Sequence, residues 1–379
     1  MATNNNNKAL NVPPLRFPEF SGEWLHCTLG DITTNFNLRN KNEIEYPMYS
    51  VTNNRGFIPQ SEQFENREML GEDIKAYKII NKDDFAYNPA RINVGSIAKY
   101  DGEQPCMISS LYVCFKANPQ IYNDWMAQLL KTPKMNYYYN INGEGGVRIY
   151  LFYPNFARIR TSYPATLSEQ KKIAHFLTLL DERIATQNKI IEKLQSLIEG
   201  LGRSCIAPKK NGGKWVTLKD ICHITTGKLD ASAMVKGGKY PFYTCAETPF
   251  AINEYAFDTE ALLISGNGAN LGYINYYKGR FNAYQRTYVL DAFTENIQYV
   301  KCVLKVVLPK RISIEKSTSN TPYIVMSTLA DMKIFLPTEI YQNRVANLMY
   351  GLETKLHQQT TILINYHHLK SYLLQQMFI

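Results

Sequence analysis

The sequence lacks the features that would place it in a membrane or outside the cell. Among its 379 residues there is no apolar run of roughly eighteen, so no membrane-spanning helix is predicted. The first residues, MATNNNNKALNVPPL, hold neither an apolar segment nor a cleavage pattern. We therefore expect no signal peptide, a short disordered lead over residues 1–12, and a cytoplasmic protein.

Patterned cysteine is also missing. The seven cysteines are scattered, their number is odd, and no C-x-x-C occurs, which favours reduced, mostly buried thiols over a disulfide framework or a zinc site. The histidine pair His367 and His368 follows His357 on a predicted helix, with no cysteine or carboxylate to complete a ligand set. We expect surface or packing roles for these histidines and no bound metal.

Three stretches resemble catalytic or nucleotide-binding motifs, but each lacks part of the motif. The glycine-rich stretches SGNGANLG at 265–272 and NGEGGVR at 142–148 are not followed by G-K-[ST], so we interpret the first as a tight strand turn. YNPA at 87–90 lacks the second proline and the aromatic residue of the adenine methyltransferase motif. No cluster of nuclease carboxylates is evident. The sequence therefore predicts no catalytic residue and a protein that is not an enzyme.

Charge is one feature that the chain does carry. Its formal net charge is +9, and residues 209–337 alone hold 16 basic against 10 acidic residues. A basic surplus suggests a polyanionic partner, although the signal is weak by itself because many proteins with this charge bind no nucleic acid.

A long amphipathic helix is the clearest positive signal. Over residues 173–201 apolar residues recur in a strict alternation of four and three, which is typical of a coiled-coil seam. Thr166 and Glu169 form a T-x-x-E capping box at its start, and Gly200, Gly202 and Pro208 end it. The predicted seam residues are Ile173, Leu177, Leu180, Ile184, Gln187, Ile191 and Leu194.

A second helix repeats the first after 172 residues. Even the polar seam residue recurs, since Gln359 matches Gln187, and one buried polar residue on each helix is a known way to fix register. Lys370 stands where an apolar residue is expected, and we predict that Leu369 replaces it. The predicted seam residues of this helix are Val345, Met349, Leu352, Leu356, Gln359 and Leu363.

The duplication extends to the regions before each helix. EYPMYSV at 45–51 pairs with KYPFYTC at 239–245, and NVGSIAKY at 93–100 pairs with NLGYINYY at 270–277. Because the offset falls from 194 to 177 between these pairs, the first half carries some 17 extra residues around 57–90. The chain is thus an internal repeat of globule, helix, globule, helix.

This order predicts the fold class. We expect an α+β protein of two similar mixed α/β domains, separated by two long antiparallel helices that form a coiled coil with a pseudo-two-fold axis. Two similar heads held at a fixed distance are how proteins read two half-sites on duplex DNA, so the helix pair would set the spacing between them.

Within each globule, β-prone segments alternate with turns, and loops should carry the recognition. Lysine and arginine are expected on phosphates, arginine on guanine, and asparagine or glutamine on adenine. The loop candidates in the first globule are Arg39, Lys41, Asn53, Asn54, Arg55 and Arg148. Those in the second are Lys228, Asn267, Asn270, Lys278, Arg280, Gln285 and Arg286. For any one of them, a solvated surface role is the alternative.

At this point the sequence resembles the specificity subunits of type I restriction-modification systems. The resemblance covers nearly the whole chain and depends on motifs whose order occurs twice. These are PPLRFPEFSGEW at 13–24, TLGDI at 28–32, PATLSEQKKIAHFLTLLDERI at 164–184, and the partial echo LP with QNRVANLM at 336–349.

The resemblance implies a non-catalytic reader of double-stranded DNA. Each globule would be a target recognition domain for one part of a bipartite, asymmetric site. The helices would space these domains and dock two modification subunits, which methylate adenine N6; two restriction subunits could join. S-adenosylmethionine, Mg²⁺ and ATP would then belong to the partner subunits, and none to this chain.

The predicted domains follow the sequence order. After the lead at 1–12 come a first recognition domain at 13–163, a spacer helix at 164–207, a second recognition domain at 208–336 and a spacer helix at 337–379. Two other functions stay open: a coiled-coil adaptor whose heads bind protein rather than DNA, and a fused methyltransferase or nuclease, which the incomplete motifs disfavour.

Overall fold

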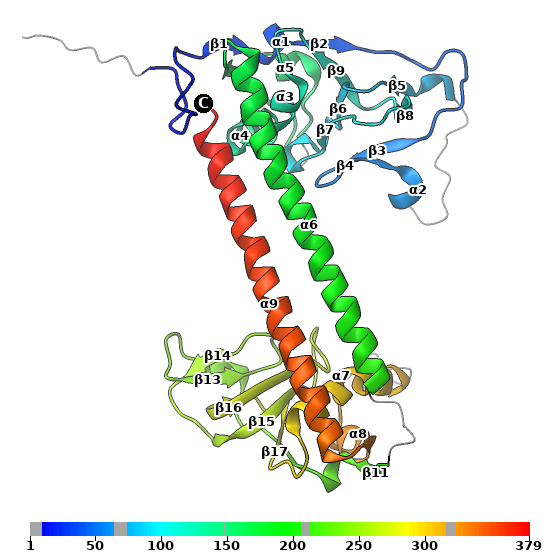
Figure 1. Ribbon diagram of the computed structural model, residues 1–379, viewed down its shortest axis with the longest axis vertical. Coiled ribbons are helices and arrows are strands. Elements are labelled where there is room, and N and C mark those ends of the chain that lie inside the picture. Colours follow the sequence, from blue (N-terminus) through cyan, green and yellow to red (C-terminus); the bar gives the residue numbers. More distant parts are fainter. Residues whose placement is uncertain (1–9, 64–73, 147–148, 206–211, 316–322) are drawn as a thin grey trace, which may run out of the picture. The chain divides into compact units, whose positions relative to one another are not determined.

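The chain folds into two compact units. In the computed structural model, residues 10–63, 74–146, 149–205, 212–315 and 323–379 are described (Figure 1). Unit 1 comprises the chain up to Gln187 together with Ile362–Ile379, and unit 2 comprises Asn188–Thr361. Because this division falls inside both long helices, each helix contributes residues to both units. The predicted domain limits follow the linear sequence instead and stay a prediction.

Unit 1 is built on a four-stranded antiparallel sheet in the order β2-β9-β6-β7, accompanied by the two-stranded pairs β1-β10, β3-β4 and β5-β8. The strands are β1 Leu25–Thr28, β2 Thr33–Phe36, β3 Tyr49–Thr52, β4 Gly56–Pro59, β5 Lys78–Ile80, β6 Phe85–Tyr87, β7 Ile97–Lys99, β8 Cys106–Ile108, β9 Val113–Ala117 and β10 Arg160–Tyr163.

Short helices connect these strands. The helices are α1 Leu29–Ile32, α2 Gln60–Gln63, η1 Ile74–Ala76, η2 Ile92–Val94, α3 Asn123–Leu129, α4 Pro133–Asn142 and α5 Tyr153–Ala157, and the long helix α6 runs over Leu167–Cys205.

Unit 2 has a six-stranded sheet in the order β12-β17-β15-β16-β13-β14 and a two-stranded pair β11-β18. The strands are β11 Lys214–Thr217, β12 His223–Thr226, β13 Tyr240–Tyr243, β14 Phe250–Ile252, β15 Phe257–Ser265, β16 Ile274–Ala283, β17 Thr287–Asp291 and β18 Lys333–Leu336. The helices are η3 Leu218–Asp220, η4 Ala231–Ala233, α7 Ile297–Glu315, α8 Met326–Ala330 and the long α9 Glu339–Gln376.

The strand registers of unit 2 repeat those of unit 1. In each unit a central strand lies between the same two neighbours, β6 between β7 and β9, and β15 between β16 and β17. One shift of 177 residues carries the pair Phe85–Lys99 onto the pair Leu262–Tyr276. Pairs β1-β10 and β11-β18 also correspond, although their two strands are displaced by different numbers of residues. The internal repeat predicted from the sequence is confirmed at the level of individual strand pairs.

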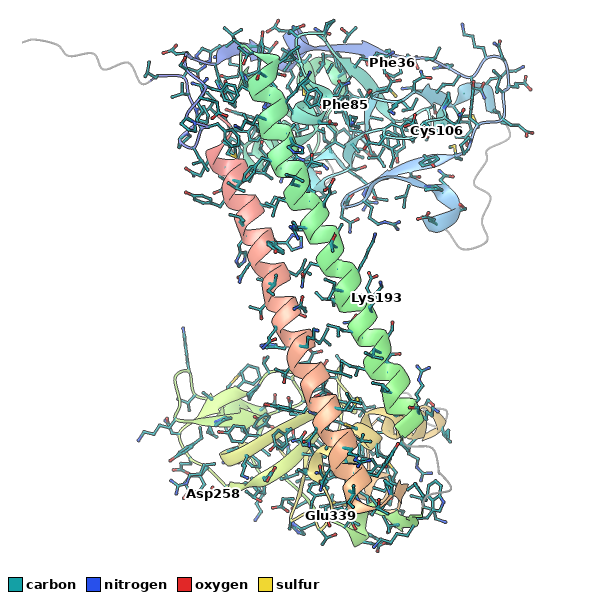
Figure 2. The ribbon with its side chains drawn as sticks, viewed as in Figure 1. Phe36, Phe85, Cys106, Lys193, Asp258 and Glu339 are labelled. Atoms are coloured by element: carbon teal, nitrogen blue, oxygen red, sulfur yellow. The ribbon has the colours of Figure 1, made fainter. Side chains whose placement is uncertain are left out.

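Each sheet packs its apolar side chains into a core of its own. In unit 1 stacked rings such as Phe85 and Phe115, with centroids 5.1 Å apart, join Trp125 and the buried face of α6 (Figure 2). In unit 2 the residues Leu262, Ile264 and Leu290 pack against α7 and the start of α9. Burial of apolar area at about 25 cal/mol per Å² is the main stabilising contribution in both cores.

Within unit 1 the two long helices are antiparallel. Near the start of α6, Glu169 bonds Trp24, whose ring packs on Phe378 at the end of the chain. Three turns further along α6, Asp181 pairs with Lys370 of α9, which precedes Phe378 in the sequence. Residues further along α6 thus contact residues earlier in the C-terminal segment. The antiparallel arrangement in the predicted fold class therefore holds in unit 1.

The predicted seam positions differ in burial along the helices. In α6 Ile191 is half-buried, and in α9 Leu352, Leu356, Gln359 and Leu363 are half-buried. The other seam positions are buried; they are Ile173, Leu177, Leu180, Ile184, Gln187, Leu194, Val345 and Met349. The start of each helix packs into the core of one unit, which accounts for the complete burial of Leu177 and the near-complete burial of Met349.

The replacement of Lys370 by Leu369 in the seam is a wrong prediction. Leu369 is 45% exposed, whereas Lys370 is half-buried and forms an ion pair with Asp181. Gln128 from α3 donates to the same carboxylate at 3.1 Å. A charged residue can occupy a seam position because a carboxylate on the facing helix is there to receive it.

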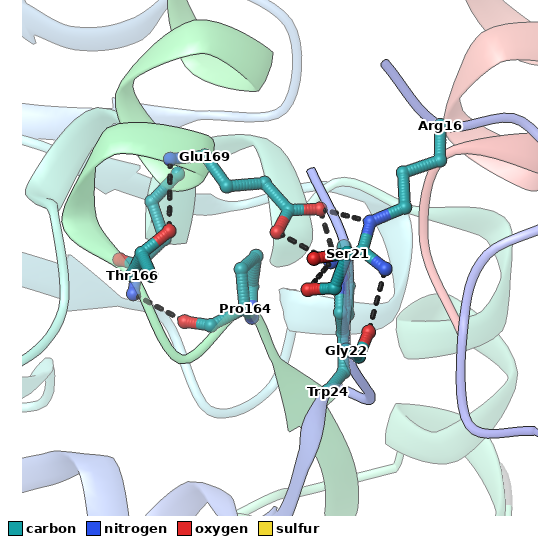
Figure 3. Close-up of polar contacts among 8 residues, drawn as sticks. Arg16, Ser21, Gly22, Trp24, Pro164, Thr166 and Glu169 are labelled. Atoms are coloured by element: carbon teal, nitrogen blue, oxygen red, sulfur yellow. Dashed lines mark hydrogen bonds and ion pairs between the residues drawn. The ribbon is translucent and has the colours of Figure 1, made fainter. Parts of the chain in front are cut away.

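The capping box predicted at the start of α6 forms only in part. The backbone N–H of Glu169 donates to the Thr166 hydroxyl at 3.3 Å, as expected of a cap. The Glu169 carboxylate does not complete the box. It accepts two hydrogen bonds from Arg16, at 2.7 and 2.8 Å, and one from the Trp24 indole at 3.1 Å (Figure 3). The N-terminal segment is thereby fastened to α6.

One matched glutamine anchors each long helix to its own unit. Gln170 accepts from the Tyr122 N–H at 2.7 Å and donates to the Pro164 carbonyl at 3.0 Å. In unit 2, Gln342 accepts from the N–H that precedes α7 and donates to the carbonyl of Pro337 at 3.1 Å. Both glutamines are buried. Matching polar contacts therefore hold the start of each long helix to its own unit.

Candidate nucleic-acid interface

Four loops converge at one edge of the unit 2 sheet. The N–H of Gln285 donates to the Leu229 carbonyl at 2.9 Å, which joins the turn before β17 to the loop after β12. The N–H of Gly266 donates to the Arg286 carbonyl at 2.8 Å, and the N–H of Tyr284 to the Tyr243 carbonyl at 2.9 Å. These backbone bonds hold segments 227–229, 243–246, 265–272 and 284–287 together.

The unit 2 loop cluster consists of Lys228, Asn267, Asn270, Gln285 and Arg286. These five sequence candidates come from three loops, and the structure brings them together at this edge. Lys228, Gln285 and Arg286 have exposed side chains, and the asparagines are half-buried. Within the described part of the chain, neither Lys228 nor Arg286 has a carboxylate partner. The cluster therefore presents unneutralised positive charge beside amide groups, the combination that contacts phosphates and base edges.

The residue before Lys228 is a glycine because the backbone of this loop lies very close to the backbone at Ala283. A methyl group on Gly227 would lie 1.9 Å from the Ala283 carbonyl oxygen, which no side chain tolerates. The first residues of the loop thus lie directly against the end of β16.

Cys245 joins the two asparagines of the cluster. Its thiol donates to Asn267 Oδ1 at 3.0 Å, and its carbonyl oxygen accepts from Asn270 Nδ2 at 3.1 Å. Sequence reasoning missed this cysteine because it looks like one more scattered thiol. The signal available was its place at the end of KYPFYTC, directly before a loop.

Two of the predicted loop residues are not in a loop. Lys278 and Arg280 lie within β16, where Lys278 contacts Glu260 at 3.3 Å and Arg280 contacts Asp258 at 2.9 Å (Figure 2). The glycine between them suggested a turn, but Gly279 adopts φ +129° inside a continuous strand. Each cation already faces a carboxylate on β15, so these two are less available to an anionic ligand than Lys228 and Arg286.

In unit 1 the predicted residues Asn53, Asn54 and Arg55 form the turn between β3 and β4. The turn packs on Gly95, because a methyl group there would lie 2.6 Å from the Asn53 carbonyl oxygen. All three turn side chains are exposed, and Arg55 pairs with Glu62 at 2.8 Å. The structure thus places the turn beside the loop that carries NVG, the counterpart of NLG in unit 2.

The remaining unit 1 candidates belong to other segments of the chain. Arg39 and Lys41 are exposed on the segment after β2, and Arg39 forms an isolated bridge with Lys78. Arg148 lies outside the described residues. Asn93, the first residue of the NVG loop, donates to Asn140 of α4 at 3.0 Å. Helix α4 therefore borders the same surface.

Several of the cysteines are buried within the cores. Burial raises the pKa of Cys106, Cys114 and Cys222 to about 12, which keeps these thiols protonated and poorly nucleophilic at neutral pH. Within the described ranges, no three histidine, cysteine or acidic side chains are grouped so that they could hold a metal ion. In the same ranges, no helix has an apolar stretch suited to crossing a bilayer.

Together these features define a class of protein. The chain is a duplicated protein, in which two units share the order of four core strands, each present loops at a sheet edge, and are both built on a pair of long helices.

Comparisons with known proteins show what the chain is similar to. Residues 212–366 match the family described as Type I restriction modification DNA specificity domain. The specificity subunit of the type I restriction enzyme EcoDI from Escherichia coli is 40% identical over 133 residues, which are 35% of this chain and 29% of that protein. A putative type I specificity subunit of Mycoplasma pneumoniae is 23% identical over 211 residues, which are 51% of this chain and 56% of that protein. These matches span less than two thirds of either relative's length.

Solved structures extend the likeness to the whole fold. The S subunit of a type I restriction-modification system from M. genitalium aligns with a TM-score of 0.69 at 16% identity, over 97% of this chain and 99% of that one. A second structure, described as explaining assembly and conformational transition of the type I system, aligns with a TM-score of 0.56 at 16% identity, over 93% and 97%. The resemblance to type I specificity subunits is confirmed.

Proposed function

We propose that this chain is the DNA-reading specificity subunit of a type I restriction-modification complex. Unit 1 and unit 2 each read one part of a bipartite, asymmetric site on double-stranded DNA. The observation that carries the proposal is the repeat of strand register in the two units, with different loop residues at matching positions. The same scaffold with different loops suits the reading of two different half-sites.

The loop clusters account for binding and for selectivity separately. Exposed Lys228 and Arg286 contact phosphates and fix the position of unit 2 on the duplex. Amide groups at the same edge contact base edges in the major groove, where each base pair has its own pattern of donors and acceptors. In unit 1 the turn at Asn53–Arg55 has the corresponding role. Because the loops are fixed to a sheet, little conformational freedom is lost on binding.

The long helices set the distance between the two half-sites and dock two modification subunits. Their outer faces carry exposed apolar side chains beyond those of the seam, including Phe176 and Leu179 on α6 and Leu348 and Tyr350 on α9. The start of α6 also carries Lys171 and Lys172, whereas the matching start of α9 has Asn343 and Arg344. The two docking surfaces therefore differ in charge, and we expect them to differ in strength.

The chemistry belongs to the partners in this proposal. S-adenosylmethionine is bound by the modification subunits, which methylate adenine N6, and ATP with Mg²⁺ is bound by restriction subunits where these join. The chain itself is non-catalytic and works in the cytoplasm, where the DNA is.

Gel-shift measurements on the chain reconstituted with its modification subunits test this function. We expect binding to duplex DNA that weakens steeply with salt, because phosphate contacts release counterions. One bipartite sequence should be bound far more tightly than the rest. No preference for any bipartite sequence would contradict the proposal.

Two other functions make different predictions. A coiled-coil adaptor whose heads bind protein would keep its partner when a polyanion competes, whereas the proposed reader would lose its DNA. A fused methyltransferase would bind S-adenosylmethionine as an isolated chain, and calorimetric titration of that chain with the cofactor decides this point.

A further inference from the structure

The orientation of the two asparagines in the unit 2 loop cluster is set by a single residue. Asn270 Nδ2 donates to the Cys245 carbonyl, which can only accept. The side-chain oxygen of Asn270 is therefore the end of the amide that makes no contact with Cys245. The Cys245 thiol donates to Asn267 Oδ1 at 3.0 Å, shorter than its 3.6 Å contact with the Arg286 carbonyl. The amino group of Asn267 is therefore the end of its amide that makes no contact with Cys245.

The remaining amide ends have no partner inside the described part of the chain. No hydrogen bond involves Asn267 Nδ2 or Asn270 Oδ1 there, and both side chains are half-buried rather than freely solvated. A partly buried donor and a partly buried acceptor, three residues apart in one turn, are each left to a ligand or to water.

We propose that Cys245 orients these two asparagines so that Asn267 reads a base-edge acceptor and Asn270 reads a base amino group. This inference rests on the proposed function. A single asparagine reads adenine by using both ends of its amide, whereas here one end of each amide is already bonded to Cys245. Asn267 instead donates to guanine O6 or N7, thymine O4 or adenine N7. Asn270 accepts from adenine N6 or cytosine N4.

Unit 1 lacks this arrangement. The residue that matches Cys245 in the repeated segment is Val51, which is buried in an apolar cluster and has no side-chain donor. The thiol therefore affects the reading of one half-site only. Cys245 is a positioning residue, since it contacts the asparagines and not the DNA.

The test measures discrimination position by position. The site is first read from the methylated motif that the wild-type complex produces, and binding is then measured to duplexes with every single base substitution. In Cys245→Ala we expect discrimination at one or two positions of one half-site to fall about tenfold, with the other half-site unchanged. Cys245→Ser keeps a donor and should discriminate like the wild type. Asn267→Asp replaces the donor end by an acceptor and should lose about tenfold at the acceptor-bearing base.

The controls separate this inference from the proposed function and from misfolding. Cys222 is a buried thiol of the same unit that bonds the Leu218 carbonyl away from the loops, and Cys222→Ser should leave every position unchanged. Intact discrimination at the other half-site shows that a variant is folded. Wild-type discrimination at all positions in both Cys245→Ala and Asn267→Asp would overturn the inference. A wild-type complex without any preferred site would instead overturn the proposed function.

Discussion

At the residue scale, the contact between Arg16 and Glu169 ties two distant segments of unit 1 together. The side chains are 15% and 3% exposed, and both guanidinium bonds are shorter than 3 Å. The hydrogen bonds to Glu169 raise the pKa of Arg16, so the guanidinium stays charged at any physiological pH. Unit 2 has no such pair, because Tyr341 matches Glu169 and Trp215, the counterpart of Trp24, is 59% exposed.

Removal of Arg16 should destabilise unit 1 strongly. Arg16→Leu leaves the Glu169 carboxylate buried without its counter-charge, at a cost of about 3 kcal/mol in the free energy of unfolding. Denaturant titration measures this cost. The control is Lys219→Ala, which removes an exposed ion pair with Asp331 and should change nothing measurable. Equal stability of Arg16→Leu and the wild type would show that the contact contributes nothing.

The stability of unit 2 should depend on pH through Glu353. Burial alone would raise the pKa of this residue, but hydrogen bonds from Lys305 and Lys301, at 2.5 and 2.9 Å, outweigh burial and lower it. A carboxyl whose pKa is lowered by folding stabilises the fold above its unfolded pKa of about 4.3 and loses that contribution as the pH falls through the folded value.

Glu353→Gln tests this dependence. The wild type should lose more free energy of unfolding than the variant when the pH is lowered from 7 to below the ordinary glutamate range, as measured by denaturation at each pH. Parallel pH profiles for the two proteins would mean that Glu353 does not contribute in this way.

At the element scale, the two long helices are fixed to their units by matched glutamines. Gln170→Ala would leave the partly buried Tyr122 N–H without an acceptor, and Gln342→Ala would do the same to the Asn296 N–H, each at a cost of about 1–3 kcal/mol in the free energy of unfolding. Hydrogen exchange should show lost protection before α3 in the first variant only and before α7 in the second only. Loss in both units from one substitution would contradict the independence of the two anchors.

The elements themselves could be predicted from the sequence because their signals are local. Alternating apolar residues gave β15, β16 and β17, and the spacing of four and three gave both long helices. Contacts between distant residues could not be predicted in this way. Glu169 meets a residue 153 positions away and Asp181 one 189 away, so neither the incomplete capping box nor the ion pair of Lys370 leaves a local trace.

The candidate site could be predicted by region rather than by residue. Lys228, Asn267 and Gln285 were selected as polar residues in turn-rich stretches, and backbone pairing of the loops brings them together. The same criterion selected Lys278 and Arg280, which are strand residues with carboxylate partners. Composition alone does not distinguish a glycine in a turn from a glycine in a strand.

At the scale of the whole molecule, helix length should set the spacing of the DNA site. Insertion of one heptad at the unit boundary of both helices, after Gln187 and after Thr361, preserves the seam and lengthens each helix by about 10 Å. At about 3.4 Å per base pair, the unspecified spacer should grow by about three base pairs, with both half-sites unchanged. Sequencing of the methylated motif reports this directly. A change in the half-site bases would refute the role of the helices as spacers.

Methylome sequencing of a host that carries the modification subunits, with and without this chain, tests the central claim most directly. The claim is that two similar units of one chain read two separate parts of one DNA site. We predict a single N6-methyladenine motif that appears only with the chain and consists of two specified parts separated by unspecified bases. A motif that is continuous, or methylation that does not depend on the chain, would contradict the account.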